Sequence, residues 1–520
     1  MTGKKFKVLV MASMSALALA GCGADDISSP GAGGDVIINP PANGGNGGTP
    51  GTPGGGGALV TPASGCPTIS DPQGLKDDGT ITGPTGTYRV CTLPSRFNTS
   101  SRLTKVAGLL YQLSGRVDVG KDGGFTASAA DTNVTLTIDP GVIIFGGAGQ
   151  SWLAVNRGNK ISAVGTATQP IIFTSRDNVL GLNTDSSQGQ WGGVVLMGRG
   201  RVTDCTTGSV AAGTCERQTE GSADPAVYGG ANDADSSGRM SYVQIRYSGF
   251  VLGANVELQS LTTEGVGSGT VLDHIMSFNS SDDGSEHFGG SPTMKYYIAV
   301  GADDDSVDVD TGAQANFQYG LLIQRPGAGD ALMEIDSNGF EADTPRTKLQ
   351  VSNFTMVQGQ VSSNNEANDQ ASVLYRGNSD VTLVNSIMAT PNNECIRMNG
   401  SGTTPSTLTA RSAVLTCNAT KYIGSGAYTA AQVATFFGAG SNGNRDDFTS
   451  TLSNGFVNGS NEMGVAAFNV SGLGSAFTAV THIGGVKDST DTWYAGWTCN
   501  SSTANFGSGN TGLCTSLPTT

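Results

Sequence analysis

The chain has 520 residues, of which only 14% are charged and 77 are Gly. Its formal net charge of −15 argues against a nucleic-acid-binding protein and against attachment to anionic membranes through basic patches. Low charge with abundant Gly, Ser, Thr and Asn favours turns and short strands over helices. The composition therefore indicates an extracytoplasmic all-β protein.

The first 22 residues are typical of an export signal. Three lysines within the first seven residues precede an apolar stretch over 8–20 that is too short to span a bilayer. The stretch ends in Leu-Ala-Gly before Cys22, which resembles a bacterial lipoprotein signal. We expect a signal peptide over 1–21 and a lipid on Cys22; the alternative is an ordinary cleaved signal followed by an unrelated cysteine. Gly23 after the cysteine implies, by resemblance to lipoprotein sorting, the outer membrane, with display at the cell surface or on the periplasmic face.

Residues 22–65 are rich in Gly and Pro, a composition that cannot bury a core and predicts a tether. Eight further cysteines follow, and an even number in an exported chain predicts disulfides. They fall into four local pairs, so we expect neighbours to pair, although the sequence alone does not fix the connectivity. The cysteines are Cys66, Cys91, Cys205, Cys215, Cys395, Cys417, Cys499 and Cys514.

From residue 131 onward, short β-branched or aromatic runs recur roughly every 17 to 33 residues between Gly, Asn, Asp and Ser clusters. Strands at such long intervals without helical patterns between them predict a solenoid, because antiparallel sandwich strands recur more often. We predict a right-handed parallel β-helix over 131–420, with a β-sandwich array or a β-propeller as alternatives. The predicted strands are 134–138, 142–145, 152–155, 170–175, 191–198, 242–249, 270–278, 295–300, 315–324, 348–357, 380–388 and 412–417.

The ends of a solenoid need protection, so 66–130 and 421–520 are assigned as N- and C-terminal caps. The second cap contains the best helical pattern of the chain, at 430–437. Trp152 and Trp191 begin predicted strands, and we expect both to be packed rather than exposed for sugar stacking.

Several segments, taken together, are similar to a family of secreted bacterial parallel β-helix surface proteins and lipoproteins. The resemblance extends over about 135–500 and implies the fold. It implies no reaction, because no general activity is assigned to that family. The segments are Gly165–Ser175, Gln190–Gly193, Gly265–Gly269, Asn279–Gly290, Met294–Gly301, Asp303–Gly312, Gln318, Glu341–Asp343 and Trp493–Trp497.

Two acidic runs beginning at Asp282 and Asp304 lie 22 residues apart, about one coil of the predicted solenoid. Stacked strands are about 4.8 Å apart, so equivalent carboxylates should lie above one another, with Glu286 over Asp308. Alternation places Val307 and Val309 in the core, and we expect the carboxylates to face solvent. We call these seven residues the acidic ladder: Asp282, Asp283, Glu286, Asp304, Asp305, Asp308 and Asp310.

Like charges at this spacing repel by roughly 1–3 kcal/mol per pair. Oxygen ligands without cysteine suit Ca²⁺, so the ladder predicts a calcium site. The alternatives are solvated turn residues and a catalytic cleft. No Ser-His-Asp order, metalloprotease motif or phosphate-binding loop is present, and we expect no nucleotide or redox cofactor. Of the three histidines only His287 is near the ladder; the others are His274 and His482.

Three functions remain open. The first is a lipid-anchored binding or structural protein that engages polysaccharide or another envelope component, and it is our main hypothesis. The second is a polysaccharide lyase or glycoside hydrolase. A lyase would need a base near the ladder, for which Lys295, Arg325 and Arg346 are the candidates. The third is an accessory partner of an outer-membrane complex.

Overall fold

The computed structural model describes residues 59–147, 149–220, 225–253, 256–337, 341–361, 371–400 and 402–519, with only the backbone at 251–253 and 256–257. These residues belong to one compact unit that spans 43–520. The predicted signal peptide, Cys22 and most of the predicted tether lie outside the described residues. No helix in the described part of the chain is long and apolar enough to cross a bilayer.

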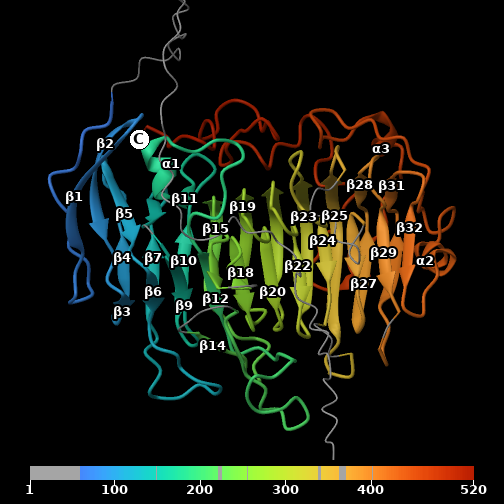
Figure 1. Cartoon of the computed structure of the whole chain (residues 1–520), viewed down its shortest axis with the longest axis horizontal. Helices are drawn as coiled ribbons and strands as arrows, with labels where there is room; N and C mark the ends of the chain where they lie inside the picture. Colours follow the sequence, from blue (N-terminus) through green and yellow to red (C-terminus); the bar gives the residue numbers. More distant parts are fainter. Residues whose placement is uncertain are drawn as a thin grey trace, which may run out of the picture. The chain divides into compact units, whose positions relative to one another are not determined.

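The unit is built from stacked coils of parallel strands, which stand side by side in Figure 1. Strands of successive coils pair in parallel with a constant register. Four strands that follow one another in this way are β18 (Leu261–Glu264), β20 (Ser285–Phe288), β22 (Asp308–Asp310) and β24 (Met333–Ile335). The strands follow from the β-branched and aromatic runs in the sequence. The prediction of a parallel β-helix is confirmed.

Two sheets carry the coils. The larger has 17 strands: β1 (Lys76–Gly83), β2 (Gly86–Thr92), β4 (Ser101–Leu103), β5 (Leu109–Leu113), β7 (Thr135–Ile138), β8 (Ile143–Gly146), β10 (Lys160–Val164), β11 (Ile171–Ser175), β15 (Gly238–Arg246), β19 (Val271–Phe278), β21 (Thr293–Val300), β23 (Gln314–Ile323), β25 (Thr347–Val357), β27 (Ser379–Val384), β28 (Ile387–Ala389), β30 (Thr407–Arg411) and β31 (Val414–Thr416). The smaller has 11: β3 (Arg96–Phe97), β6 (Arg116–Val119), β9 (Trp152–Val155), β12 (Gly193–Met197), β18 (Leu261–Glu264), β20 (Ser285–Phe288), β22 (Asp308–Asp310), β24 (Met333–Ile335), β26 (Val373–Tyr375), β29 (Ile396–Asn399) and β32 (Tyr422–Ser425).

Short elements complete the unit. Two hairpins of the described residues lie outside these sheets: β13 (Arg217–Gln218) with β14 (Val227–Tyr228), and β16 (Val251–Gly253) with β17 (Val256–Glu257). The helical segments in the described part of the chain are α1 (Arg176–Leu180), α2 (Ala430–Phe437), α3 (Ser460–Met463) and the 3₁₀ helix η1 (Val470–Leu473).

From β15 onward the larger sheet bends once in each coil at a residue with positive φ, whereas in earlier coils a short loop joins two separate strands, as between β10 and β11. In β15 the residue is Tyr242, whose φ is 53°, and the two halves of β15 on either side pair with β10 and β11 respectively. The same corner is occupied on later coils by His274, Tyr296, Tyr319 and Asn353. The bend divides this sheet into two faces, and the smaller sheet forms the third side of the coil.

Alternate side chains from all three sides point into the coil and form one continuous core. Val307 and Val309 are fully buried there, as the alternation predicts. Trp191 and Trp152 are also buried, at 0% and 3% exposure, which confirms that both are packed.

The assignment of 66–130 as a cap is wrong for most of that range. Parallel pairing already begins at β2, which pairs with β5, while β3 pairs with β6. Only β1 differs, because it pairs with β2 in the antiparallel direction and covers the first coil. The sequence does not predict the first coils, because their strands are short and charged residues alternate with the apolar ones. Strand β3, for example, has two residues.

The assignment of 421–520 as a cap is correct only at its start. Helix α2 forms where predicted and closes the end of the coil by burying Val433 and Phe437 in the main core. The later part, residues 465–517, instead runs back along the outside of the larger sheet; we call it the strap. Figure 1 shows it in orange to red, ending beside β2 and α1. Leu517 accordingly packs with Tyr88 and Val90 of the first coils.

Candidate metal centre

The acidic ladder lies on the outer side of the smaller sheet. Glu286 of β20 pairs directly with Asp308 of β22, which pairs in turn with Glu334 of β24. The predicted stacking of Glu286 over Asp308 is therefore correct, and it extends one coil further than predicted. A second column runs beside the first, where Phe288 pairs with Asp310.

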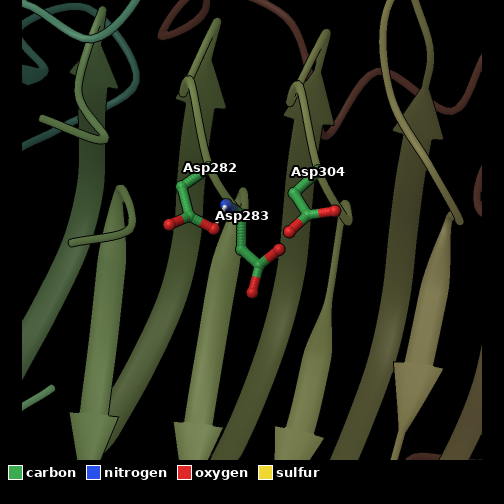
Figure 2. Close-up of side chains that lie close together, drawn as sticks. All are labelled: Asp282, Asp283 and Asp304. Carbon is green, nitrogen blue, oxygen red and sulfur yellow. Dashed lines mark hydrogen bonds between the residues drawn. The ribbon is translucent and has the colours of Figure 1, made fainter. Parts of the chain in front are cut away.

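Five of the seven ladder carboxylates gather in two groups that share Asp283. In the first group, one oxygen from each of Asp282, Asp283 and Asp304 lies within 4.8 Å of the others. Figure 2 shows these three side chains together, with Asp283 between the other two. In the second group, Asp283, Glu286 and Asp308 meet within the same limit. Two successive coils thus supply both groups, through the turns before β20 and β22 and through the strands themselves.

The other two ladder residues lie outside these groups. Asp305 directs Oδ1 to the backbone N–H of Ala331 at 2.8 Å, so it connects its own coil to the next. Asp310 lies beside Arg217, whose charge lowers the pKa of Asp310 while burial, the larger effect, raises it. Asp305 and Asp310 are therefore structural neighbours of the candidate centre.

The expectation that the carboxylates face solvent is wrong for four of the seven ladder residues, while Asp282, Asp304 and Asp308 are partly exposed. Asp283, Glu286, Asp305 and Asp310 are only 4–6% exposed. One reason is that Asp283 and Asp305 turn along the stack, where each accepts a backbone N–H of the following coil at 2.8 Å. Alternation in a strand distinguishes the inner side from the outer side, but it does not say whether the outer side is covered.

A segment from the coil after β12 forms part of that cover. It spans 198–220 and 225–230, is closed by the Cys205–Cys215 disulfide, and we call it the lobe. Its backbone is tied to the ladder strands, because Thr203 N–H donates to the carbonyl of Thr311 at 2.9 Å. The guanidinium of Arg217, a residue of the lobe, lies 5.8 Å from the ring centre of Phe288 in β20.

Sequence reasoning missed Glu264 and Arg217. Glu264 of β18 is fully buried, and it accepts a 2.8 Å hydrogen bond from Thr219 Oγ1 of the lobe. Glu264 ends the short run Leu261–Glu264, which lies one coil before the ladder strand β20. The spacing between that run and β20 could have identified it. Arg217 carries no such signal, since it comes from an irregular loop.

Burial and mutual repulsion raise the pKa values of the clustered carboxyl groups. Burial first, then the charges of Asp282 and Asp304, raises the pKa of Asp283 well above its ordinary range. Glu286 and Asp308 are raised in the same way. Burial is the main cause that raises the pKa of Glu264 to about 8. A site of this kind favours either retained protons or a bound cation.

One buried oxygen points to a cation rather than to a protein partner. Oδ1 of Asp308 is buried and has no hydrogen-bond partner within the described part of the chain. Glu286, which is 6% exposed, belongs with Asp308 to the group around Asp283. Closely spaced hard oxygens of this sort fit Ca²⁺, which takes several carboxylate ligands.

The three candidate bases for a lyase are engaged elsewhere. Lys295 donates to Thr478 of the strap at 2.9 Å, and Arg346 donates to the carbonyl of Pro405 at 3.0 Å. Arg325 donates to Gln188 and lies 3.6 Å from Asp303, which precedes the ladder. None of the three is bonded to a ladder carboxylate in the described structure.

The histidines are not ligands of either group. His287 points into the coil, where its Nδ1 is 2.8 Å from Thr263 Oγ1. His274 stacks between the rings of Tyr242 and Tyr296. His482 belongs to the strap. The candidate centre therefore consists of oxygen ligands, as the sequence indicates.

The eight cysteines form four disulfides, each between neighbours in sequence, which confirms the expected framework. Each closes a loop of 10 to 25 residues, a constraint that reduces the entropy of the unfolded chain. The pairs are Cys66–Cys91, Cys205–Cys215, Cys395–Cys417 and Cys499–Cys514.

Comparison with models of known protein families matches residues 111–498 to the pectate-lyase-like β-helix domain. Comparison with curated proteins found no match, and comparison with solved structures found none. The matched range contains the strands from β6 to β32, the ladder, the lobe and most of the strap. The chain therefore belongs to the pectate-lyase-like β-helix family.

Proposed function

We propose that this chain is a lipid-anchored, extracytoplasmic β-helix binding protein whose acidic ladder binds Ca²⁺. The observation that carries the proposal is the convergence of Asp283, Glu286 and Asp308 within 4.8 Å, with Oδ1 of Asp308 buried and without a hydrogen-bond partner among the described residues. Three negative charges at such distances repel one another strongly unless protons or a cation neutralise them.

Calcium suits this arrangement better than magnesium. Ca²⁺ accepts six to eight oxygen ligands in irregular geometry, whereas Mg²⁺ requires a tight octahedron and retains several waters. Asp283 belongs to both carboxylate groups, so its two oxygens can serve neighbouring positions along the stack. The rigid backbone of stacked coils holds the ligands in place before the ion arrives.

The proposed location in the cell is inferred from the sequence and from the disulfides. Cys22 after a short apolar segment supports attachment to the outer membrane through its lipid. Four disulfides support an oxidising compartment, because such bonds persist outside the cytoplasm. We place the β-helix beyond the tether at the cell surface, where its long sides are available to polysaccharide or to another envelope component.

Binding is favoured over cleavage because the candidate bases are occupied. Lys295 bonds the strap, and Arg325 and Arg346 bond other groups away from the clustered carboxylates. The family name alone does not assign lyase activity, since one β-helix scaffold supports many functions. Hydrolase chemistry would need an acid and a base on either side of a bound sugar, and four of the seven ladder carboxylates are buried.

Calorimetric titration of the protein with Ca²⁺, and with Mg²⁺ at the same ionic strength, tests the metal site. We expect saturable Ca²⁺ binding that is lost in Glu286→Gln and retained in Asp380→Asn, which changes a carboxylate on the larger sheet. Equal heats in all three proteins would contradict the site.

A glycan array probed with calcium and with chelator tests the binding role. Retention of a polysaccharide without shortening it supports the proposal. Release of new chain ends would instead support the enzymatic alternative, and capture of an outer-membrane protein by crosslinking in the absence of glycan binding would support the accessory role.

A further inference from the structure

The strap is attached to the coils mainly through side-chain amides that bind its main chain. Gln318 exchanges two hydrogen bonds with the backbone of Thr478, at 2.7 and 2.8 Å. Asn385 does the same with Phe468, at 3.0 and 2.6 Å. Each coil thus contributes a local contact, and no strand of the two large sheets is formed by the strap. Such a segment can separate from the coils without disturbing their strand pairing.

The surface beneath the strap is apolar. Met276, Phe278, Ile298 and Val300 lie on the outer side of the larger sheet and form a separate cluster with the strap's Trp497. Their neighbours in the strands, such as Ile275 and Tyr297, point inward to the main core. The coil interior would therefore stay intact when the strap leaves, while this outer cluster would be exposed to water.

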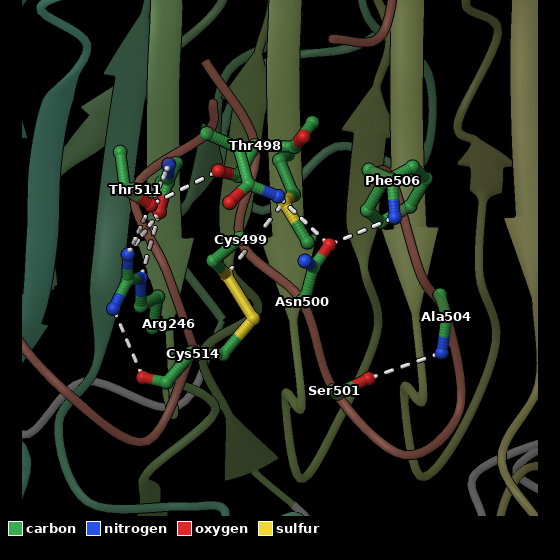
Figure 3. Close-up of a disulfide and its surroundings, with 12 residues drawn as sticks. Arg246, Thr498, Cys499, Asn500, Ser501, Ala504, Phe506, Thr511 and Cys514 are labelled. Atoms are coloured by element: carbon green, nitrogen blue, oxygen red, sulfur yellow. Dashed lines mark hydrogen bonds between the residues drawn. A yellow bond between two sulfur atoms is a disulfide. The ribbon is translucent and has the colours of Figure 1, made fainter. Parts of the chain in front are cut away.

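The C-terminal end of the strap is held by a buried arginine. Arg246 of β15 is 0% exposed, and its Nη1 donates to the carbonyls of Cys514 at 2.9 Å and Ser516 at 3.0 Å. Its Nη2 donates to Thr511 Oγ1 at 3.1 Å, as Figure 3 shows. Gln244, two residues earlier, donates to the carbonyl of Trp497.

This arginine has no ion pair among the described residues. The other fully buried arginine, Arg157, differs because it is paired with Asp122 and Glu216 at 2.6 Å each. The charge of Arg246 is instead stabilised by neutral oxygens, most of which belong to the strap. A buried guanidinium loses much of its stabilisation if those oxygens leave, so Arg246 favours the closed strap.

The disulfide at this end is the most protected of the four. Cys499 and Cys514 are both 0% exposed, and they lie in the apolar cluster under the strap. Each other pair has one cysteine that is partly exposed: Cys66, Cys205 and Cys417. A thiolate can therefore reach the Cys499–Cys514 bond only when the strap opens.

We propose that the strap is a lid that opens as a unit separate from the coils, latched at its C-terminal end by Arg246, which holds the loop that the Cys499–Cys514 disulfide closes. Opening exposes this disulfide to an external dithiol: its two thiols supply two electrons and two protons, the Sγ–Sγ bond breaks, Cys499 and Cys514 become thiols, and the dithiol becomes a disulfide. Oxidation by the reverse exchange restores the closed loop that Arg246 binds. The open state uncovers the apolar outer face of β19 and β21. This lid does not rest on the calcium site.

The test is the rate at which each disulfide reacts with dithiothreitol under native conditions, followed by alkylation and peptide mapping of the whole protein. In the unmodified protein we expect Cys499–Cys514 to react ~10-fold or more slowly than Cys205–Cys215. Arg246→Met should accelerate only Cys499–Cys514, by ~10-fold or more, because it removes several hydrogen bonds to the strap. Arg157→Met is the matched control and should accelerate Cys205–Cys215, next to Glu216, while the latch stays protected.

A second variant guards against misfolding of the coils. Thr511→Val changes only the strap and removes the oxygen that accepts from both Gln244 and Arg246. It should accelerate the same disulfide and increase the binding of an apolar dye, with unchanged circular dichroism of the strands. Equal reaction rates of all four disulfides in the unmodified protein would overturn the proposal. Acceleration of all four by Thr511→Val would overturn it too, because the strap and coils would then open together.

Discussion

Asp283 Oδ1 accepts a 2.8 Å hydrogen bond from the backbone N–H of Asp305, the equivalent position on the next coil. Asp305 repeats the arrangement with Ala331 one coil later. The same carboxylates therefore connect successive coils and repel each other along the stack. This double role explains why acidic residues are buried where the sequence alone predicts a solvated face.

Two substitutions at Asp283 separate the roles. Asp283→Asn keeps an oxygen acceptor and removes a charge, so without calcium its stability should equal or exceed that of the unmodified protein. Asp283→Ala leaves the Asp305 N–H without its acceptor and should lower the free energy of unfolding by about 1–3 kcal/mol. Urea denaturation in the presence of chelator measures both. Equal losses in the two variants would show that the hydrogen bond is not what Asp283 contributes.

Stability without calcium should fall as the pH rises toward 8 and should level off above it. Burial raises the pKa of Asp310 to about 7 and that of Glu264 to about 8. Between the ordinary carboxyl pKa of about 4 and these raised values, the folded protein holds protons that the unfolded chain has lost, so the stability that each group contributes is lost progressively over that interval. The loss is about 1.4 kcal/mol per pH unit for each group up to its folded pKa, and it stops above that value.

Melting curves between about pH 6.5 and pH 9, with chelator present, measure this dependence. The range excludes His287, because burial lowers its pKa to about 3 and its contribution changes only below the ordinary histidine value. Glu264→Gln should flatten the upper part of the fall. A stability that rises over this range in both proteins would contradict the assignment of retained protons.

Cys22→Ala should release the protein from membranes. The lipid on Cys22 supplies the membrane affinity in our proposal, since each buried methylene contributes about 0.8 kcal/mol. Fractionation of cells that express the variant should move the protein from the membrane pellet to the soluble fraction. A variant that stays in the pellet would show that another part of the chain makes the attachment.

Much of the fold was predictable from the sequence because its coils repeat. The run 152–155 is β9 without any shift, and 348–357 differs from β25 by one residue at its start. The register of Glu286 over Asp308 followed from equal spacing of two acidic runs. Repetition encodes such features locally, since each coil pairs with its neighbours in the same way.

The cover over the ladder and the course of the strap could not be predicted. The lobe approaches through single contacts, such as Thr219 with Glu264, that leave no periodic pattern. The strap is held through main-chain atoms, which every residue has, so its sequence does not encode its path. Long-range contacts between irregular segments decide which carboxylates are buried, and spacing along the chain does not report them.

The melting temperature of the unmodified protein and of Asp308→Asn, with and without calcium, tests the central claim most directly. A ligand that binds only the folded state stabilises it by about 2.7 kcal/mol at a hundredfold excess over its Kd. Calcium should therefore raise the melting temperature of the unmodified protein well above the value with chelator, and Asp308→Asn should show little response because a central carboxylate is gone. Equal shifts with calcium and with magnesium at matched ionic strength, or an unchanged calcium response in Asp308→Asn, would contradict a calcium site formed by Asp283, Glu286 and Asp308.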